Sequence, residues 1–115
     1  MSYLTNFNVI FTIVERGKSE TIIRATHEAG AEGATVFFGR GTGIHEKRKI
    51  LGIPIEPEKE IVITLIEKEK TDAVLEAIVS AGKLNEPGKG RAFVVSVEKM
   101  TGALHLEQKN KQDNG

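Results

Sequence analysis

The sequence contains no cysteine and no tryptophan, and it has a single tyrosine. Without cysteine the chain has no disulfide, no cysteine-ligated metal or iron–sulfur cluster and no thiol nucleophile. It also has no apolar run that approaches the ~18 residues of a membrane span, and its first residues carry no basic segment typical of a signal peptide. We therefore expect a cytoplasmic protein without direct membrane insertion.

Neither sign of charge is in excess. Sixteen Lys and Arg balance sixteen Asp and Glu, so the sequence has none of the bulk positive charge of proteins that coat nucleic acid, and we expect no nucleic-acid partner. The length of 115 residues is that of one domain. With 39% hydrophobic and 28% charged residues, that domain is of the ordinary globular kind.

The chain alternates strand and helix patterns. Runs of aromatic and β-branched residues predict strands over Phe7–Val14, Ala34–Phe38, Glu60–Glu67 and Ala92–Val97. Apolar residues at helical spacing predict one helix that is capped by Gly17 or Ser19 and ends at Gly30 in a left-handed conformation. A second helix opens at Thr71-Asp72. The order β-α-β-β-α-β indicates an α+β fold of the ferredoxin-like, split βαβ kind.

A sheet of this fold carries both helices on one face, so its other face is polar in a monomer. The predicted strands are instead apolar on both faces, as in the first strand, where Val9, Phe11 and Ile13 alternate with Ile10 and Val14. An open apolar face of that size is larger than monomers usually tolerate, so we expect self-association through it. The alternative is a neighbouring loop that folds over the face.

Two segments could bind an anion. The first, residues 39–59, shows no helical or strand period and begins with the glycine-rich stretch Gly39–Gly43, which permits close backbone approach to a ligand. The second contains Gly88 and Gly90, with Lys89 and Arg91 as donors to phosphate. Neither matches a standard nucleotide fingerprint. Each is also compatible with a turn that carries solvated charges.

Catalytic machinery is not apparent. The three histidines, His27, His45 and His105, do not have the spacing of metal ligands, so we expect no metal site. His45-Glu46 could exchange protons, but adjacent residues on a long loop are seldom preorganised for catalysis. We expect a protein that is not an enzyme.

Three stretches are similar to a known family. They are Ala29–Val36 leading into Gly41-Thr42-Gly43, Thr71–Ile78, and Gly88–Val94. In their order and spacing these stretches resemble the P-II nitrogen-regulatory signalling family, and more closely its divergent PII-like members. The resemblance covers about residues 7–98.

The resemblance implies a ferredoxin-like homotrimer that binds an adenine nucleotide (AMP, ADP or ATP) in the clefts between subunits. It implies a domain over 1–106, with a T-loop-like effector loop at 39–59 and a B-loop-like phosphate loop at 82–91. The remaining residues, 107–115, are polar, and from this composition we expect a disordered tail. The base and sugar would lie near Gly33, Thr35, Gly41, Thr42 and Gly43, and the phosphates near Gly88, Lys89, Gly90 and Arg91. The effector loop would present His45, Lys47, Arg48 and Lys49 to a target protein.

The sequence departs from the family pattern at the start of its effector loop. Ile44-His45 stands where the family has Arg-Gln, whose Gln helps to bind a metal and 2-oxoglutarate. Ile63 occupies the place of a glutamate that faces the ligand, and the basic C-terminal motif of the family is missing. The resemblance therefore does not carry over a metal or a 2-oxoglutarate site. Fewer cations near the distal phosphates favour a mono- or diphosphate.

We thus expect a regulatory protein that binds an adenine nucleotide and controls a transporter or a metabolic enzyme through its long loop. Two alternatives stay open at this point. One is a trimeric ferredoxin-like module that binds another small anion or an amino acid, and the other is a purely structural trimer.

Overall fold

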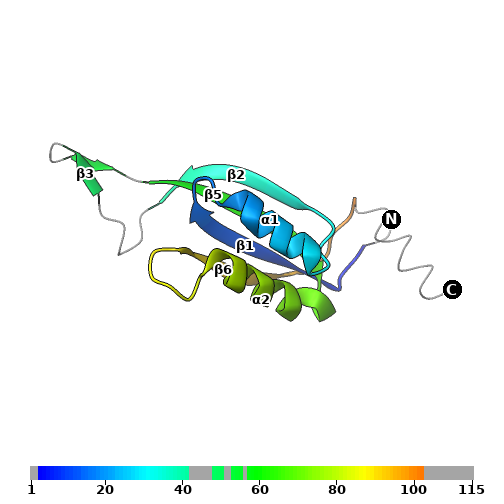
Figure 1. Cartoon of the computed structure of the whole chain (residues 1–115). Coiled ribbons are helices and arrows are strands. Elements are labelled where there is room, and N and C mark those ends of the chain that lie inside the picture. The colour runs from blue at the N-terminus through cyan, green and yellow to red at the C-terminus, as the bar shows by residue number, and fades with distance from the viewer. Residues whose placement is uncertain (1–2, 42–47, 51–52, 56, 103–115) are drawn as a thin grey trace.

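The computed structural model describes residues 3–41, 48–50, 53–55 and 57–102, and of 48–50 and 53–55 it describes the backbone alone. Two helices cover one face of a four-stranded sheet, and a small hairpin extends from one end (Figure 1). The elements are β1 (Phe7–Glu15), α1 (Ser19–Glu28), β2 (Ala34–Arg40), β3 (Arg48–Ile50), β4 (Ile53–Ile55), β5 (Glu58–Glu67), the 3-10 turn η1 (Lys68–Lys70), α2 (Thr71–Gly82) and β6 (Gly90–Val97).

The sheet has the order β2-β5-β1-β6 and is antiparallel throughout. β1 lies in its interior, so that Phe7 pairs with Glu67 of β5 on one side and with Val97 of β6 on the other. Each helix joins an interior strand to an edge strand and packs on the same face (Figure 1). The predicted ferredoxin-like α+β fold is confirmed.

The core lies between the helices and the sheet. Alternate residues of β1 and β5 point toward the helices because side chains along a strand alternate between its faces. The buried apolar residues of this layer are Ile10, Val14, Ile22, Ala31, Val62, Ile66, Val74 and Ile78, none more than 3% exposed. Removal of these side chains from water is the main stabilising contribution to the protomer.

The first helix begins differently from the prediction of a cap at Gly17 or Ser19. Lys18 occupies the cap position, and no side chain of the turn bonds the helix start. The Oε1 atom of Glu60 accepts a hydrogen bond from the Ser19 N–H at 2.9 Å. A carboxylate from β5 therefore accepts the hydrogen bond of the first backbone N–H of α1. The helix ends as predicted, with Gly30 at a φ of +114°.

The prediction that residues 39–59 lack regular structure is wrong in part. Arg48–Ile50 pairs with Ile53–Ile55 as a two-stranded antiparallel sheet. The β-branched residues Ile50, Ile53 and Ile55 favour strands.

The predicted strands are also too short. β2 extends to Arg40, β5 starts at Glu58 and β6 starts at Gly90, because pairing with a neighbouring strand continues past the apolar run. Residues 42–47 of the predicted effector loop and the predicted disordered tail, 107–115, lie outside the described residues. Within the described ranges, neither helix is long and apolar enough to cross a membrane.

Candidate functional site

The two glycine-rich segments lie at the same end of the sheet. Arg40 pairs with Glu58 at the end of β2, and Gly90 pairs with Val14 at the start of β6. This is also the end from which the β3–β4 hairpin extends (Figure 1). Gly41, which follows β2, and the loop before β6 are therefore at a common level along the strands.

The same two segments lie on opposite edges of the sheet. β5 and β1 separate β2 from β6, and with about 4.8 Å between neighbouring strands the two edges are about 14 Å apart. One phosphate group cannot contact both edges of a single protomer. A site that uses both segments needs one edge from each of two chains.

The base of the long loop is held at its two ends. The Gly41 N–H donates to the Pro57 carbonyl at 3.2 Å, which continues the β2–β5 pairing by one step. Nearby, Arg16 Nη1 lies 2.7 Å from Glu58 Oε2, in an exposed ion pair between the β1–α1 turn and β5. The point at which the chain leaves the sheet is thus fixed by both backbone and side-chain contacts.

An open hollow of about 320 Å³ lies beside this base. It is lined by Arg16, Phe38, Gly39, Arg40 and Glu58. Phe38 is 72% exposed, although it is a large apolar residue on an edge strand. The hollow therefore has an aromatic residue, Phe38, and two arginines, Arg16 and Arg40, in its lining at the base of the predicted effector loop.

At the other edge, the chain enters β6 through two glycines with positive φ. Gly88 has a φ of +79° and Gly90 a φ of +135°. A Cβ atom added at Gly90 would lie 2.4 Å from the Ile13 carbonyl oxygen, so no other residue fits there without displacement of β1. The glycines set the path of this loop through backbone geometry, as the sequence indicates.

The structure places the two cations of this loop on different sides of the sheet. Arg91 pairs with Ile13, in the register positions that face away from the helices. Lys89 lines a cavity on the helix side together with Val14 and Ile22. That both cations contact one nucleotide phosphate stays a prediction.

The predicted residues of β2 are spread along the strand. Thr35 lies opposite Ile63 on the face away from the helices and is exposed, whereas Gly33 precedes β2 at the far end of the sheet. Gly33 and Gly41 flank the 7 residues of β2, so eight steps of 3.3 Å place them about 26 Å apart. The structure brings Gly41, but not Gly33, to the level of the β6 loop.

Part of the predicted site cannot be placed. Thr42, Gly43, His45 and Lys47 lie outside the described residues. Arg48 and Lys49 lie on β3, for which the backbone alone is described.

Sequence reasoning missed the role of Glu60. Hydrogen bonds from the backbone N–H and hydroxyl of Ser19, and from the backbone N–H groups of Gly17 and Lys18, lower the pKa of this carboxyl below its usual value despite burial. Glu60 thereby fixes the β1–α1 turn that carries Lys18. The sequence shows only a glutamate in an apolar strand, and this does not predict a hydrogen bond to a residue 41 positions away.

The second face of the sheet is apolar, as predicted. It carries residues from all four strands: Val9, Phe11, Ile13, Thr35, Phe37, Ile61, Ile63, Leu65, Arg91, Phe93, Val95 and Val97. The rings of Phe11 and Phe93 stack at a centroid distance of 5.3 Å. Phe37, Phe93 and Val95 are each 44–45% exposed, so the described residues do not cover them. We call these twelve residues the open face.

Among the described residues, no three His, Asp or Glu side chains lie close enough together to hold a metal ion.

Comparison with known proteins places this geometry in context. The family model of nitrogen regulatory protein P-II matches residues 7–103. Among solved structures, the chain is similar to an Arabidopsis thaliana PII that was crystallised with bound citrate. That match has a TM-score of 0.68 and 22% sequence identity, and it covers 87% of this chain and 85% of the other.

Proposed function

The chain belongs to the nitrogen regulatory protein P-II family, and from this premise we propose that it is a cytoplasmic, non-enzymatic regulator that binds an adenine nucleotide between the subunits of a homotrimer. The nucleotide state is passed to a target protein, a transporter or a metabolic enzyme, through the long loop of residues 39–59. Residues of that loop offered to the target are His45, Lys47, Arg48 and Lys49.

One observation carries the proposal. Gly41 and the β6 entry loop lie at the same end of the sheet but on opposite edges. Two protomers packed side by side would bring the β2 edge of one against the β6 edge of the other. A cleft between chains is therefore the arrangement in which both segments can contact one ligand.

The open face supports the assembly. Phe37, Phe93 and Val95 stay nearly half-exposed in a protomer, and complete burial of such a side chain is worth about 1.5–3 kcal/mol. Packing of open faces against one another would remove them from water. We base the number of three subunits on membership of the family.

In the proposed cleft, the β2 side contacts the base and sugar and the β6 side contacts the phosphates. Arg91 is the main cation at the phosphates because its register position faces away from the helices. Gly88 and Gly90, which have positive φ and no side chain, let the loop backbone come close to the ligand. The β2 side comprises Gly33, Thr35, Gly41, Thr42 and Gly43, and Lys89 completes the β6 side.

Titration calorimetry with ADP tests the proposal. Arg91→Ala should weaken ADP binding by about 1.5–3 kcal/mol, the usual contribution of a charge-assisted hydrogen bond, and leave the assembly intact. Lys68→Ala is the matched control, since Lys68 is exposed on η1 at the opposite end of the sheet. An absence of ADP binding to the unmodified chain would contradict the proposal.

A second candidate ligand is a small carboxylate, because the similar Arabidopsis PII holds citrate. The same cations would bind its carboxylates. Citrate in place of ADP in the calorimeter separates the two, since a nucleotide site should bind ADP more tightly than citrate.

A further inference from the structure

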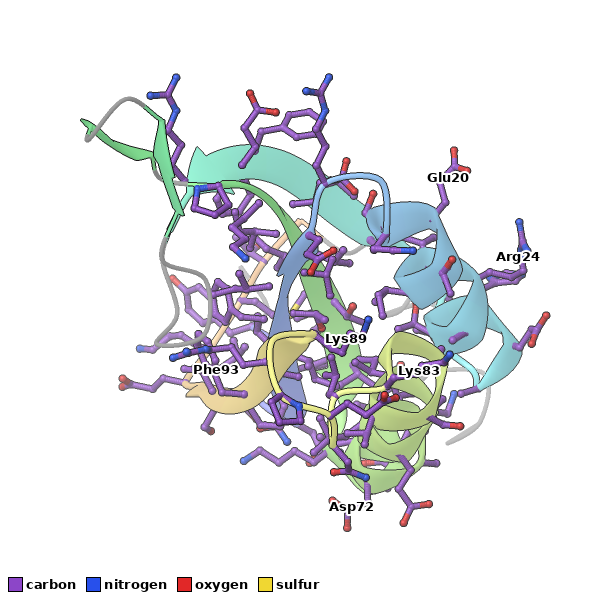
Figure 2. The ribbon with its side chains drawn as sticks, turned by 60° about the vertical axis from the view of Figure 1, so that its left-hand side comes forward. Glu20, Arg24, Asp72, Lys83, Lys89 and Phe93 are labelled. Carbon is purple, nitrogen blue, oxygen red and sulfur yellow. The ribbon has the colours of Figure 1, made fainter. Side chains whose placement is uncertain are left out.

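A second cavity lies on the helix side of the sheet, away from the open face. It has a volume of about 160 Å³ and lies between the first turn of α1 and the last turn of α2. Its lining residues are Val14, Glu15, Lys18, Thr21, Ile22, Ala81, Gly82, Lys83 and Lys89. Figure 2 shows Lys83 and Lys89 at the end of α2 from which the loop to β6 departs.

Three lysines from three separate segments converge on this cavity. Lys18 comes from the β1–α1 turn, Lys83 from the end of α2 and Lys89 from the loop before β6. Within the described part of the chain, none of them has an ion-pair partner. Three lysines and one glutamate, Glu15, give the residues that line the cavity a net charge of two positive.

The backbone at Lys83 is unusual. Lys83 has a φ of 55°, and it is the one non-glycine residue with positive φ in the described ranges. It ends α2 in the left-handed conformation, a position that glycine usually occupies because it has no Cβ. Lys83 lines the cavity in spite of this backbone cost.

The lysines, and not the start of α1, supply the positive charge. Glu60 already accepts the Ser19 N–H, so the first amide of the helix is occupied. The inner wall of the cavity is formed by Val14, Ile22 and Ala81. An apolar wall lowers the local dielectric constant and strengthens attraction between the ammonium groups and an anion.

We propose that this cavity binds a dianionic phosphate group, either free phosphate or a small phosphate monoester. The two negative charges of the group match the two net positive charges, and lysine binds phosphate as a compact point charge. The apolar wall would accept the small carbon body of a monoester. This cavity lies on the helix side of the sheet, whereas Arg91, the main cation of the nucleotide cleft proposed above, faces the other way. Lys89 is the one residue named for both, so the phosphate site goes beyond the nucleotide cleft through Lys18 and Lys83.

Titration of the full chain by heteronuclear NMR tests the proposal, with inorganic phosphate in one arm and glycerol phosphate in the other. Sodium chloride keeps the ionic strength constant. We expect the amide signals of Lys18, Thr21 and Lys83, which line the cavity and are not cleft contacts, to shift in at least one arm. The tighter arm identifies free phosphate or a monoester as the preferred form.

Lys83→Gly is the decisive variant because it removes the ammonium group while it relieves the left-handed strain, so the protein should fold at least as well. Phosphate binding should weaken at least tenfold in Lys83→Gly and in Lys18→Ala. Lys68→Ala removes an equal charge far from the cavity and should bind as the unmodified chain does.

Three results would overturn the proposal. The first is an absence of saturable shifts at the cavity amides in both arms, and the second is unchanged affinity in Lys83→Gly. The third is a set of shifts confined to the surroundings of Arg91. ADP affinity distinguishes this site from the proposed cleft: Lys18→Ala should bind ADP normally, and Arg91→Ala should lose ADP affinity yet keep the phosphate response.

Discussion

Glu60 offers a test of how β5 holds the start of α1. Its carboxylate accepts the Ser19 N–H at 2.9 Å from a side chain that is 7% exposed. Glu60→Ala removes the acceptor and leaves the amides of the turn without a partner. Glu60→Gln keeps the shape and one acceptor oxygen but removes the charge.

The size of the effect follows from the contact. A hydrogen bond to a charged group contributes about 1.5–3 kcal/mol, and a neutral one about 1 kcal/mol. We therefore expect Glu60→Ala to lower the free energy of unfolding by about 2–3 kcal/mol, and Glu60→Gln by about 1 kcal/mol. Both are measurable against the roughly 5–15 kcal/mol of net stability of a domain.

The pH dependence gives a sharper criterion. Because the pKa of Glu60 is lowered in the folded state, the carboxylate stabilises the fold above its unfolded pKa, and this contribution is lost as the pH falls through the folded pKa. The difference in unfolding free energy between the unmodified chain and Glu60→Gln should therefore be full near pH 7. It should begin to narrow as the pH falls past the ordinary glutamate value of about 4.3, and close once the pH is below the lowered folded pKa.

Urea unfolding followed by circular dichroism, at a fixed protein concentration, measures both quantities. Glu58→Gln is the control, because Glu58 is on the same strand and its ion pair with Arg16 is exposed. Such a pair is worth about 0–1 kcal/mol. A Glu60→Gln penalty equal to that of Glu58→Gln, or one that persists unchanged at low pH, would refute the capping role.

Three further predictions concern the sheet. Gly90→Ala should lower the free energy of unfolding in urea by about 2–4 kcal/mol. Gly17→Ala is the control, because Gly17 also has positive φ but has open space around it, and it should lower that free energy by about 1–2 kcal/mol. Equal losses for the two variants would refute the close contact of Gly90 with β1. Thr64→Val should raise the free energy of unfolding by about 1 kcal/mol, because the buried Thr64 hydroxyl has no hydrogen-bond partner among the described residues. Thr71→Val should lower it, because the Thr71 hydroxyl accepts a hydrogen bond from Asn8 and donates one to the Glu67 carbonyl. Val95→Glu places a charge on the open face and should dissociate the assembly in light scattering, while Ser96→Glu, exposed on the same strand but facing the other way, should not; identical masses for the two variants would contradict assembly through that face.

The order of elements could be predicted because each has a local signal. The apolar alternation of the strands and the spacing of Ile22, Val74 and Ile78 depend on neighbouring residues, and those residues form the core in the structure. The ends of the strands could not be predicted as well. Arg40 and Glu58 extend β2 and β5 through pairing with each other, a contact that neither residue signals alone.

The site was predicted in part for the same reason. The glycines of the β6 loop have a local signature, and the structure gives Gly88 and Gly90 the positive φ that only glycine adopts readily. The separation of Lys89 from Arg91 was not predictable, because it depends on the backbone turn at Gly90 and on the strand register of β6. The Glu60 contact joins residues distant in sequence, and no pattern within one element indicates it.

Native mass spectrometry of the full chain, with and without ADP, tests the central claim most directly, because it reports assembly and ligand binding together. The account predicts a trimer whose mass increases by one ADP per subunit, and an Arg91→Ala trimer that fails to take up ADP at the same concentration. A monomer that binds ADP, or a trimer whose mass ADP does not change, would contradict a nucleotide site built between subunits.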